Sequence, residues 1–260
     1  MSRPPAEVLH PARLVARRRE VRRQRVTRIR RIVVSVFAVC LLTYGGWSIA
    51  HSSLFALDGV EIVGAHHVTR SQVLSVSGVR LGMNVLSVEP GVVAGRIEKL
   101  PFVGAARVER IYPSKVRILI SERVPVAVVS MPGGRYLIDD RGVALVPVGE
   151  TDGLPVIRSA SGDEVQLGRP LSDAGALQGL LIWRSLPVSL RSKVFTIDAT
   201  SPVAVTINVE GASVVFGDAS SLGAKVAVFG SLLERARTTH HALLSADLRA
   251  PTHPAARFSS

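Results

Sequence analysis

PFVGAARVERIYPSKVRILISERVPVAVV, residues 101–129, contains two runs of alternating apolar and polar residues separated by a turn sequence. The turn is Tyr112-Pro113-Ser114, a composition that favours chain reversal over strand continuation. Because successive side chains of a strand point to opposite sides, each run presents one apolar face. The pattern predicts a hairpin with one buried face and one charged face. The buried face would be formed by Ala106, Val108, Val116, Ile118 and Ile120.

A strand and two helices are predicted ahead of this hairpin. Residues 55–65 show the alternation of a first strand. Thr69 followed by Gln72 is the pattern of a capping box at a helix start, and Gly78 is placed to end that helix. A second helix is predicted over residues 89–100. The order strand, helix, helix, strand, strand predicts a small module in which both helices cover the buried face of the hairpin.

The N-terminal part of the chain has the composition of a membrane anchor. Residues 1–31 hold most of the positive charge of a chain whose formal net charge is +12, and they have too few apolar residues to fold alone. Residues 32–50 are uncharged and would span about 28 Å as a helix, close to the ~30 Å hydrocarbon core of a bilayer. Tyr44 and Trp47 suit the far interface. The positive-inside rule predicts a cytoplasmic tail at residues 1–31, with residues 51–260 outside the cytoplasm.

The alternative interpretation of this segment is a cleaved signal peptide that ends at Ala50. The apolar run is longer than an ordinary signal sequence, so we favour the anchor. The only cysteine, Cys40, lies inside the predicted span, so the exported part has neither disulfides nor a thiolate metal site. The basic tail also allows contact with anionic lipid. Its charge is explained by membrane topology, and we expect no nucleic-acid partner.

Residues 124–250 are predicted to form a second, β-rich domain, because short strands punctuated by turns replace the earlier pattern. Strands are predicted at 126–130, 135–138, 143–148, 194–198, 203–209 and 212–216, with a last one in 243–250, and helices at 172–186 and 222–236. Residues 251–260 are predicted to be a flexible tail. The predicted fold class is α+β, with an N-terminal transmembrane helix, a β-α-α-β-β module and a β-rich domain with two helices.

No catalytic or metal-binding motif is evident in the sequence. His66-His67 and His240-His241 are sequence neighbours, which do not share a helix face and point to opposite sides of a strand. Asp139-Asp140 and Asp163-Glu164 lie in turn contexts, where aspartate is expected for backbone reasons. The chain lacks the G-x-S-x-G, P-loop and H-E-x-x-H patterns. We therefore expect no enzyme activity, no cofactor and no small-molecule substrate. An anchored cell-wall hydrolase is the enzyme alternative.

The module resembles the POTRA module of the bacterial cell-division protein family FtsQ, also called DivIB. Residues 55–64 are similar to its first strand, and Leu81-Gly82-Met83-Asn84-Val85-Leu86 is similar to its linker between helices. Glu122, Arg123 and Pro125 resemble its closing signature. The resemblance implies a POTRA module at residues 54–123 that contributes to recruitment, and an FtsQ-type β domain at residues 124–250.

The second domain is also similar to this family. Gly217 and Lys225 match the approach to its last helix, and Ala246-Asp247-Leu248-Arg249 is similar to its final strand. The resemblance implies that residues 246–250, ending in Ala250, form an edge strand that binds FtsB/DivIC and FtsL-type division proteins. In some family members a large aromatic residue follows Asp-Leu-Arg, whereas here Ala250 and Pro251 follow.

The implied function is a non-enzymatic, membrane-anchored scaffold at the division septum, linked indirectly to the septal peptidoglycan synthases. The implied location is the cytoplasmic membrane, which is the inner membrane where two are present. The alternative from another class is a POTRA-containing module for protein export or chaperoning, because POTRA units also serve translocation machines.

Overall fold

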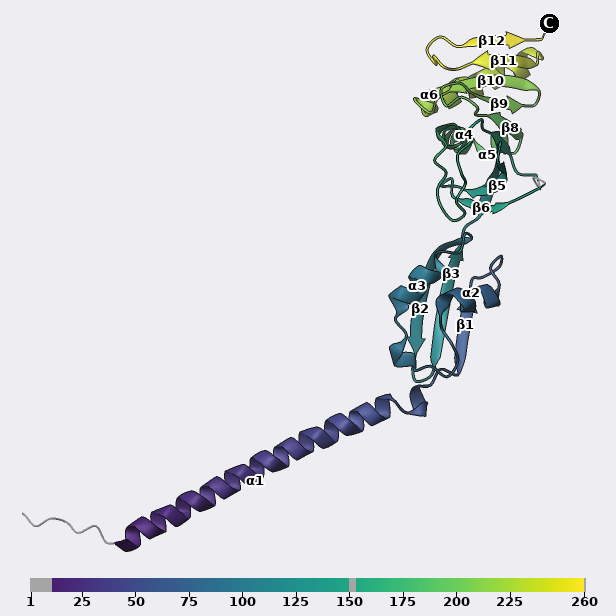
Figure 1. The fold of residues 1–260 in the computed structure, drawn as a ribbon. Coiled ribbons are helices and arrows are strands. Elements are labelled where there is room, and N and C mark those ends of the chain that lie inside the picture. Colours follow the sequence, from purple (N-terminus) through teal and green to yellow (C-terminus); the bar gives the residue numbers. More distant parts are fainter. Residues whose placement is uncertain (1–10, 150–152, 260) are drawn as a thin grey trace, which may run out of the picture.

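The structure, a computed structural model, describes residues 11–149 and 153–259, with side chains from Arg30 onward within those ranges. The helix α1, Pro11–Ala50, is followed by a small α/β domain and then by a larger sheet domain (Figure 1). Within α1, Arg30–Ala50 is long and apolar enough to cross a membrane. The basic segment was not predicted to be helical, and from Pro11 onward it continues the apolar helix without a break. Extending an existing helix avoids the nucleation cost, and arginine is a good helix former.

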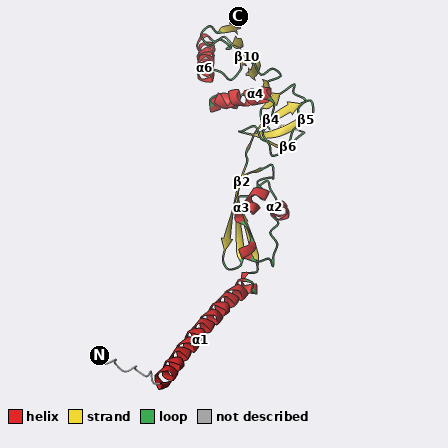
Figure 2. Ribbon diagram, turned by 60° about the vertical axis from the view of Figure 1, so that its left-hand side comes forward, coloured by secondary structure: helices red, strands yellow, loops and turns green. Residues whose placement is uncertain are grey.

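The first domain is the predicted strand-helix-helix-strand-strand module. Its sheet has the order β1-β3-β2, with β1 parallel and β2 antiparallel to β3. The helices α2 and α3 accompany this sheet (Figure 2), and Val116, Ile118 and Ile120 of β3 are buried, which confirms the predicted hairpin face. The elements are η1 Ser53–Phe55, β1 Gly59–Val63, α2 Arg70–Ser77, η2 Val85–Ser87, α3 Pro90–Ile97, β2 Val103–Ile111 and β3 Lys115–Glu122.

The start of α2 confirms the capping-box prediction. The Thr69 side chain accepts a hydrogen bond from the backbone N–H of Gln72, and the Gln72 side chain accepts one from the N–H of Thr69. Gly78 ends the helix with a φ of 72°, a left-handed conformation that glycine adopts without steric cost. Local residue choice therefore sets both ends of α2.

The second domain is built on one sheet of nine strands in the order β12-β11-β10-β9-β8-β7-β4-β5-β6. The strands β7 and β12 and the short helix α5 are additional to the sequence prediction. The elements are β4 Pro125–Met131, β5 Gly134–Asp139, β6 Ala144–Pro147, β7 Val156–Arg158, α4 Ala174–Ser185, α5 Val188–Arg191, β8 Val194–Asp198, β9 Val205–Val209, β10 Ala212–Gly217, α6 Leu222–Thr239, β11 Leu243–Asp247 and β12 Ala255–Phe258.

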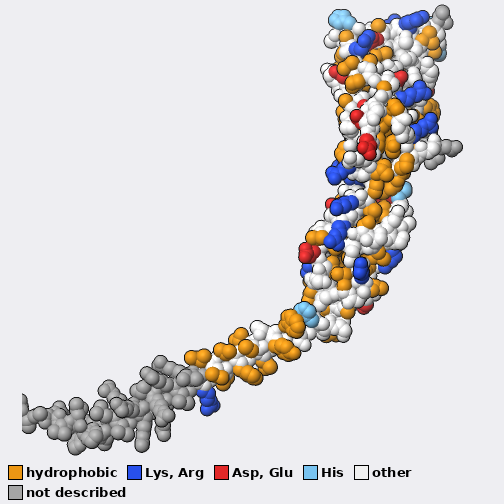
Figure 3. Space-filling view, in the orientation of Figure 1, with side chains coloured by type: hydrophobic (Ala, Val, Ile, Leu, Met, Phe, Trp, Pro, Cys, Tyr) orange, Lys and Arg blue, Asp and Glu red, His pale blue; other side chains and the backbone are white. Residues whose placement is uncertain are grey.

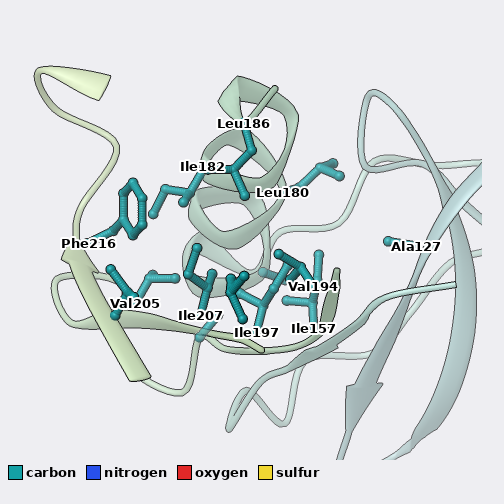
Figure 4. Packing of buried hydrophobic residues seen from close by; sticks show 14 of the residues in the cluster. Ala127, Ile157, Leu180, Ile182, Leu186, Val194, Ile197, Val205, Ile207 and Phe216 are labelled. Atoms are coloured by element: carbon teal, nitrogen blue, oxygen red, sulfur yellow. The ribbon is translucent and has the colours of Figure 1, made fainter. Parts of the chain in front are cut away.

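The core of this domain lies between α4, α6 and the central strands. Leu180 and Ile182 of α4 lie over Ile197 and Ile207 of the sheet, and all four are buried (Figure 4). Gly179 allows this close approach, since a Cβ there would lie 3.1 Å from Cγ2 of Ile157 and within similar distances of two further side chains. The core therefore fixes α4 directly on the middle of the sheet.

The C-terminal residues do not form the predicted flexible tail. The chain turns after Arg249, and β12 pairs antiparallel with β11, with Ala256 opposite Ala246. Phe258 packs against the buried core, and the guanidinium carbon of Arg235 lies 5.7 Å from its ring centroid. The prediction failed because a four-residue strand after Pro254 carries too little alternation to be recognised locally.

Replacement of Ile197 by alanine should destabilise the second domain by about 2–5 kcal/mol, because it leaves a cavity under α4. The measurement is urea unfolding of the full chain in detergent, followed by Trp183 fluorescence in a Trp47→Phe background. Val203→Ala serves as the control, since Val203 is 69% exposed. Equal midpoints for the two variants would contradict this placement of the core.

Candidate partner-binding edge and domain junction

The free edge of the large sheet is β12, and the predicted edge strand lies one position inside it. Ala246 and Asp247 of β11 are paired with Ala256 and Ala255 of β12 on one side and with β10 on the other. Ala246 and Leu248 are buried, and the N–H of Leu248 donates to the carbonyl of Val215. The prediction that residues 246–250 form an edge strand is therefore wrong in position. Pairing with the unpredicted β12 is the physical reason.

Asp247 and Arg249 form a local ion pair where β11 ends. Nε and Nη2 of Arg249 donate to the carboxylate of Asp247 at 2.6–3.1 Å. These side-chain bonds, together with the backbone N–H of Arg249, hold the pKa of Asp247 below its usual value. Gly217 makes room for the arginine stem, because a Cβ there would lie 2.9 Å from Cγ of Arg249. Ala250 accepts a turn hydrogen bond from the N–H of His253.

Lys225 secures the loop between β10 and α6. Its side chain is 1% exposed, and its Nζ donates to the backbone carbonyl and the carboxylate of Asp218 at 3.0 and 3.1 Å. Hydrogen bonds from Ser220, followed by that from Lys225, lower the pKa of Asp218 to about 2. The residues that carried the family resemblance thus have structural roles at the ends of β10 and β11: Gly217 lies close to the stem of Arg249, and Lys225 holds Asp218, the residue after Gly217.

The free edge of β12 consists of four residues with small side chains at its start. The N–H of Ser259 donates to the carbonyl of Ala242 beside β11. Since N–H directions alternate along a strand, the N–H of Arg257 also faces β11, and those of Ala256 and Phe258 face away from it. Unpaired groups at such an edge are a template for another strand. Ala255 and Ala256 leave room for its close approach.

The opposite edge of the sheet is partly covered. Ala144, the first residue of β6, donates to the carbonyl of Arg169 and accepts from the N–H of Gly168. Val143 and Pro170 form an isolated bridge beside it. The loop that covers this edge also reaches the first domain, since the Cβ position of Gly168 lies 3.5 Å from Cα of Pro101. Strand addition therefore has more room at β12 than at the start of β6.

Glu122, the last residue of β3, holds a loop of the first domain. Its side chain is 8% exposed and accepts hydrogen bonds from the backbone N–H groups of His66, His67 and Val68, at 2.8–3.0 Å. Burial of the carboxylate opposes its ionisation, but these N–H donors and the His67 ring outweigh it and lower the pKa from 4.5 to about 2. The His67 ring also stacks on Phe102, with centroids 4.9 Å apart.

Arg123 connects the first domain to the second. Its Nη1 donates to the Asp139 carboxylate at 2.7 Å, with side-chain exposures of 18% and 3%. The other carboxylate oxygen of Asp139 accepts from the N–H groups of Arg141 and Val143. Pro125 begins β4 and lies opposite Asp139 in the sheet. The Glu-Arg-x-Pro sequence thus contacts the loop at residues 66–68 of the first domain through Glu122, and the turn that begins at Asp139 of the second domain through Arg123.

Several of the remaining polar residues singled out from the sequence have structural contacts: Ser172 donates to the carboxylate of Asp163, and Arg184 pairs with Asp140. Asp139 has the turn role predicted for it. In residues 30–149 and 153–259, no group of three or more His, Cys, Asp or Glu side chains is arranged to hold a metal ion. Asn84 has a connecting role that the sequence did not indicate, because its side chain donates to the carbonyl of Ala50 at 2.6 Å. This contact joins the first domain to the end of α1.

Among the described residues, one helix that is long and apolar enough to cross a membrane precedes a small α/β module and a larger sheet domain with an open strand edge. This is the architecture of a modular protein with a candidate N-terminal anchor. Two family descriptions match within this chain. "POTRA domain, FtsQ-type" matches residues 55–123, and "Cell division protein FtsQ/DivIB, C-terminal" matches residues 127–249. The chain belongs to the FtsQ/DivIB family of bacterial cell-division proteins. This is not a known enzyme family.

The relatives are named "Cell division protein FtsQ". The chain is 27% identical to that of Streptomyces collinus over 243 residues, which cover 90% of each chain. It is 28% identical to that of Mycobacterium leprae over 212 residues, or 79% of this chain and 60% of the relative. It is 32% identical to that of a Geobacter species over 135 residues, or 49% of each. The chain thus spans about three fifths of the length of the mycobacterial relative. The strand β12 lies beyond the matched C-terminal domain.

Glu122→Gln should lower the stability of the first domain at neutral pH. It should also remove the part of that stability that the wild-type chain loses as the pH falls. The folded-state pKa of Glu122 is depressed, so its contribution is present above pH 4.5 and is lost as the pH falls toward 2. The full contribution is on the order of 3 kcal/mol. Hydrogen exchange at residues 66–73, measured between pH 7 and pH 3 with correction for intrinsic rates, checks this. The control is Glu61→Gln, since Glu61 is 54% exposed.

Arg123→Met should loosen the junction between the domains, because it leaves the buried Asp139 carboxylate without its cation. The measurement is the distance distribution between spin labels at Arg107 and Arg158, placed on cysteines in a Cys40→Ser background. The distribution should broaden. Arg117→Met is the matched control, since it breaks an exposed ion pair inside the first domain. An unchanged width for Arg123→Met would show that the ion pair does not orient the domains.

Proposed function

We propose that this chain is a non-enzymatic scaffold of the bacterial divisome that holds FtsB/DivIC and FtsL-type proteins and links them to septal peptidoglycan synthesis. Family membership supports a role in cell division. The observation that carries the binding mode is the open edge of β12, to which a partner strand can add. This edge takes the place of residues 246–250 in the proposed site.

The proposed topology follows from charge. The basic residues lie at the N-terminal side of the candidate span Arg30–Ala50, so the N-terminus is cytoplasmic and both folded domains lie outside the cytoplasm. In this orientation α1 anchors one end of the molecule, and β12 lies at the other end (Figure 1). The proposed location is the division septum. The first domain, residues 54–123, is proposed to contribute to recruitment.

Strand addition needs no deep pocket, because the partner pairs with the backbone of an exposed edge strand. Each main-chain hydrogen bond to an added strand contributes about 0.5–1.5 kcal/mol net, and alternate side chains set its register. Arg257 is exposed on β12, and Arg249 lies just before it with its charge paired to Asp247. A partner strand with an acidic side chain beside Arg257 would gain further attraction. In this proposal, the edge strand β12 is held in place by its inner neighbours, residues 247–250.

Ala256→Pro should abolish capture of FtsB/DivIC and FtsL-type proteins while the domain stays folded. Proline removes an N–H that faces the free edge, and Ala256 is not expected to donate to β11. The measurement is co-purification of these proteins with the intact chain from membranes, at matched expression. Ala174→Pro is the control, because Ala174 is the exposed first residue of α4, where proline is tolerated.

Circular dichroism and Trp183 fluorescence verify that both variants fold. Loss of both partners from Ala256→Pro but not from Ala174→Pro supports the edge as the binding site. Equal capture by a folded Ala256→Pro variant places the partner elsewhere. Absence of division proteins from the intact chain as well would contradict the proposed scaffold.

A further inference from the structure

A groove lies in the second domain beside the junction, away from β12. It is lined chiefly by Val126, Leu154, Pro155, Trp183, Val188 and Phe195 and has a volume of about 410 Å³. The strand β8, which contributes Phe195, is separated from β12 by three strands of the sheet. At the usual strand spacing this is about 19 Å. The groove is therefore distinct from the proposed strand-addition site.

Large apolar side chains stand exposed at the groove. Val188 and Phe195 are 72% and 70% exposed. Val124, two residues before Val126, is 71% exposed. Figure 3 shows hydrophobic side chains gathered on this face of the second domain, just beyond its junction with the first. Exposed apolar groups concentrated around a groove are typical of a surface that binds another molecule.

Two of the residues that line the groove, Trp183 and Arg191, carry polar groups. Within residues 30–149 and 153–259, Nε1 of Trp183 and Nε of Arg191 are buried without a hydrogen-bond partner. The Arg191 guanidinium lies over the Trp183 ring, 5.5 Å from its centroid. Arg191 is the one charged residue among the described residues that line the groove. Arg191 therefore gives the lining of the groove its positive charge, which favours an anionic group on a ligand.

We propose that this groove binds a short segment of a partner polypeptide that carries a bulky apolar side chain close to a carboxylate. The apolar side chain packs between Val188 and Phe195, and the carboxylate pairs with Arg191. The charge of the lining selects an acidic ligand over a basic one. Membrane lipid fits less well, because the first domain lies between this groove and the membrane helix (Figure 1). This site is independent of the proposed role of β12.

The probe is a phage-displayed library of random 12-residue peptides, selected against the full chain in lipid nanodiscs. Selected peptides should carry an aromatic or large aliphatic residue within a few positions of Asp or Glu. Binding of a synthetic consensus peptide, measured by fluorescence anisotropy, should weaken at least tenfold in Phe195→Ser and Val188→Ser. It should also weaken in Arg191→Gln and with rising salt. Val203→Ser is the matched control, because Val203 is 69% exposed and lies outside the groove.

Phe195 and Val188 are exposed, so their serine variants should fold and the test does not depend on the partly buried Arg191. Enrichment of basic peptides, failure of any peptide to be enriched, or equal binding to Phe195→Ser would overturn the proposal. Self-association of the intact chain that Phe195→Ser abolishes would identify a second copy as the occupant instead. Competition by empty anionic nanodiscs would identify lipid, which also contradicts a peptide site.

Discussion

The arrangement of the two domains depends on two neighbouring side chains that point in different directions. Glu122 accepts three backbone N–H groups from residues 66–68, and Arg123 donates to the buried carboxylate of Asp139 in the next domain. Both interactions involve a charge in a partly buried position, where loss of one partner is costly. The N–H of Arg123 is bonded to the carbonyl of Phe102, so the strand that carries both charges is itself fixed in the first domain. One short sequence thus closes a domain and orients the next.

The strongly alternating strands could be predicted from the sequence, but the strands that lie next to them in the sheet could not. The hairpin, the capping box at Thr69 and the strand at Val194–Asp198 follow from local pattern, and the structure contains all three. Period-two alternation identifies which face of a strand is buried. It does not identify the strand next to it, which is why β12 and the inner position of residues 246–250 were missed. The three-residue strand β7 is too short to show a period.

The motif residues of the second domain illustrate a related limit. Gly217, Lys225 and Asp247-Arg249 indicated the family, and the resemblance assigned the last of these to a binding edge. In the structure they hold the ends of β10 and β11: Lys225 is buried against Asp218, and the stem of Arg249 lies close to Gly217. A sequence motif can therefore mark the framework that presents an edge while the edge itself lies a few residues further on. The pairing of the strands in the structure is needed to tell whether a motif belongs to the framework or to the edge itself.

The shortness of β12 constrains how the proposed scaffold can hold a partner. Of the four residues of β12, only Ala256 and Phe258 direct their N–H and C=O groups outward. An added strand therefore forms about four hydrogen bonds, which contribute roughly 2–6 kcal/mol. Micromolar affinity requires about 8 kcal/mol, so the edge alone is too weak for stable capture in solution. A short edge also limits unwanted pairing with other chains. In the proposed topology, confinement in one membrane would raise the effective concentration of partners anchored beside α1. A weak edge at one end and the proposed anchor at the other would therefore favour assembly at the membrane over aggregation away from it.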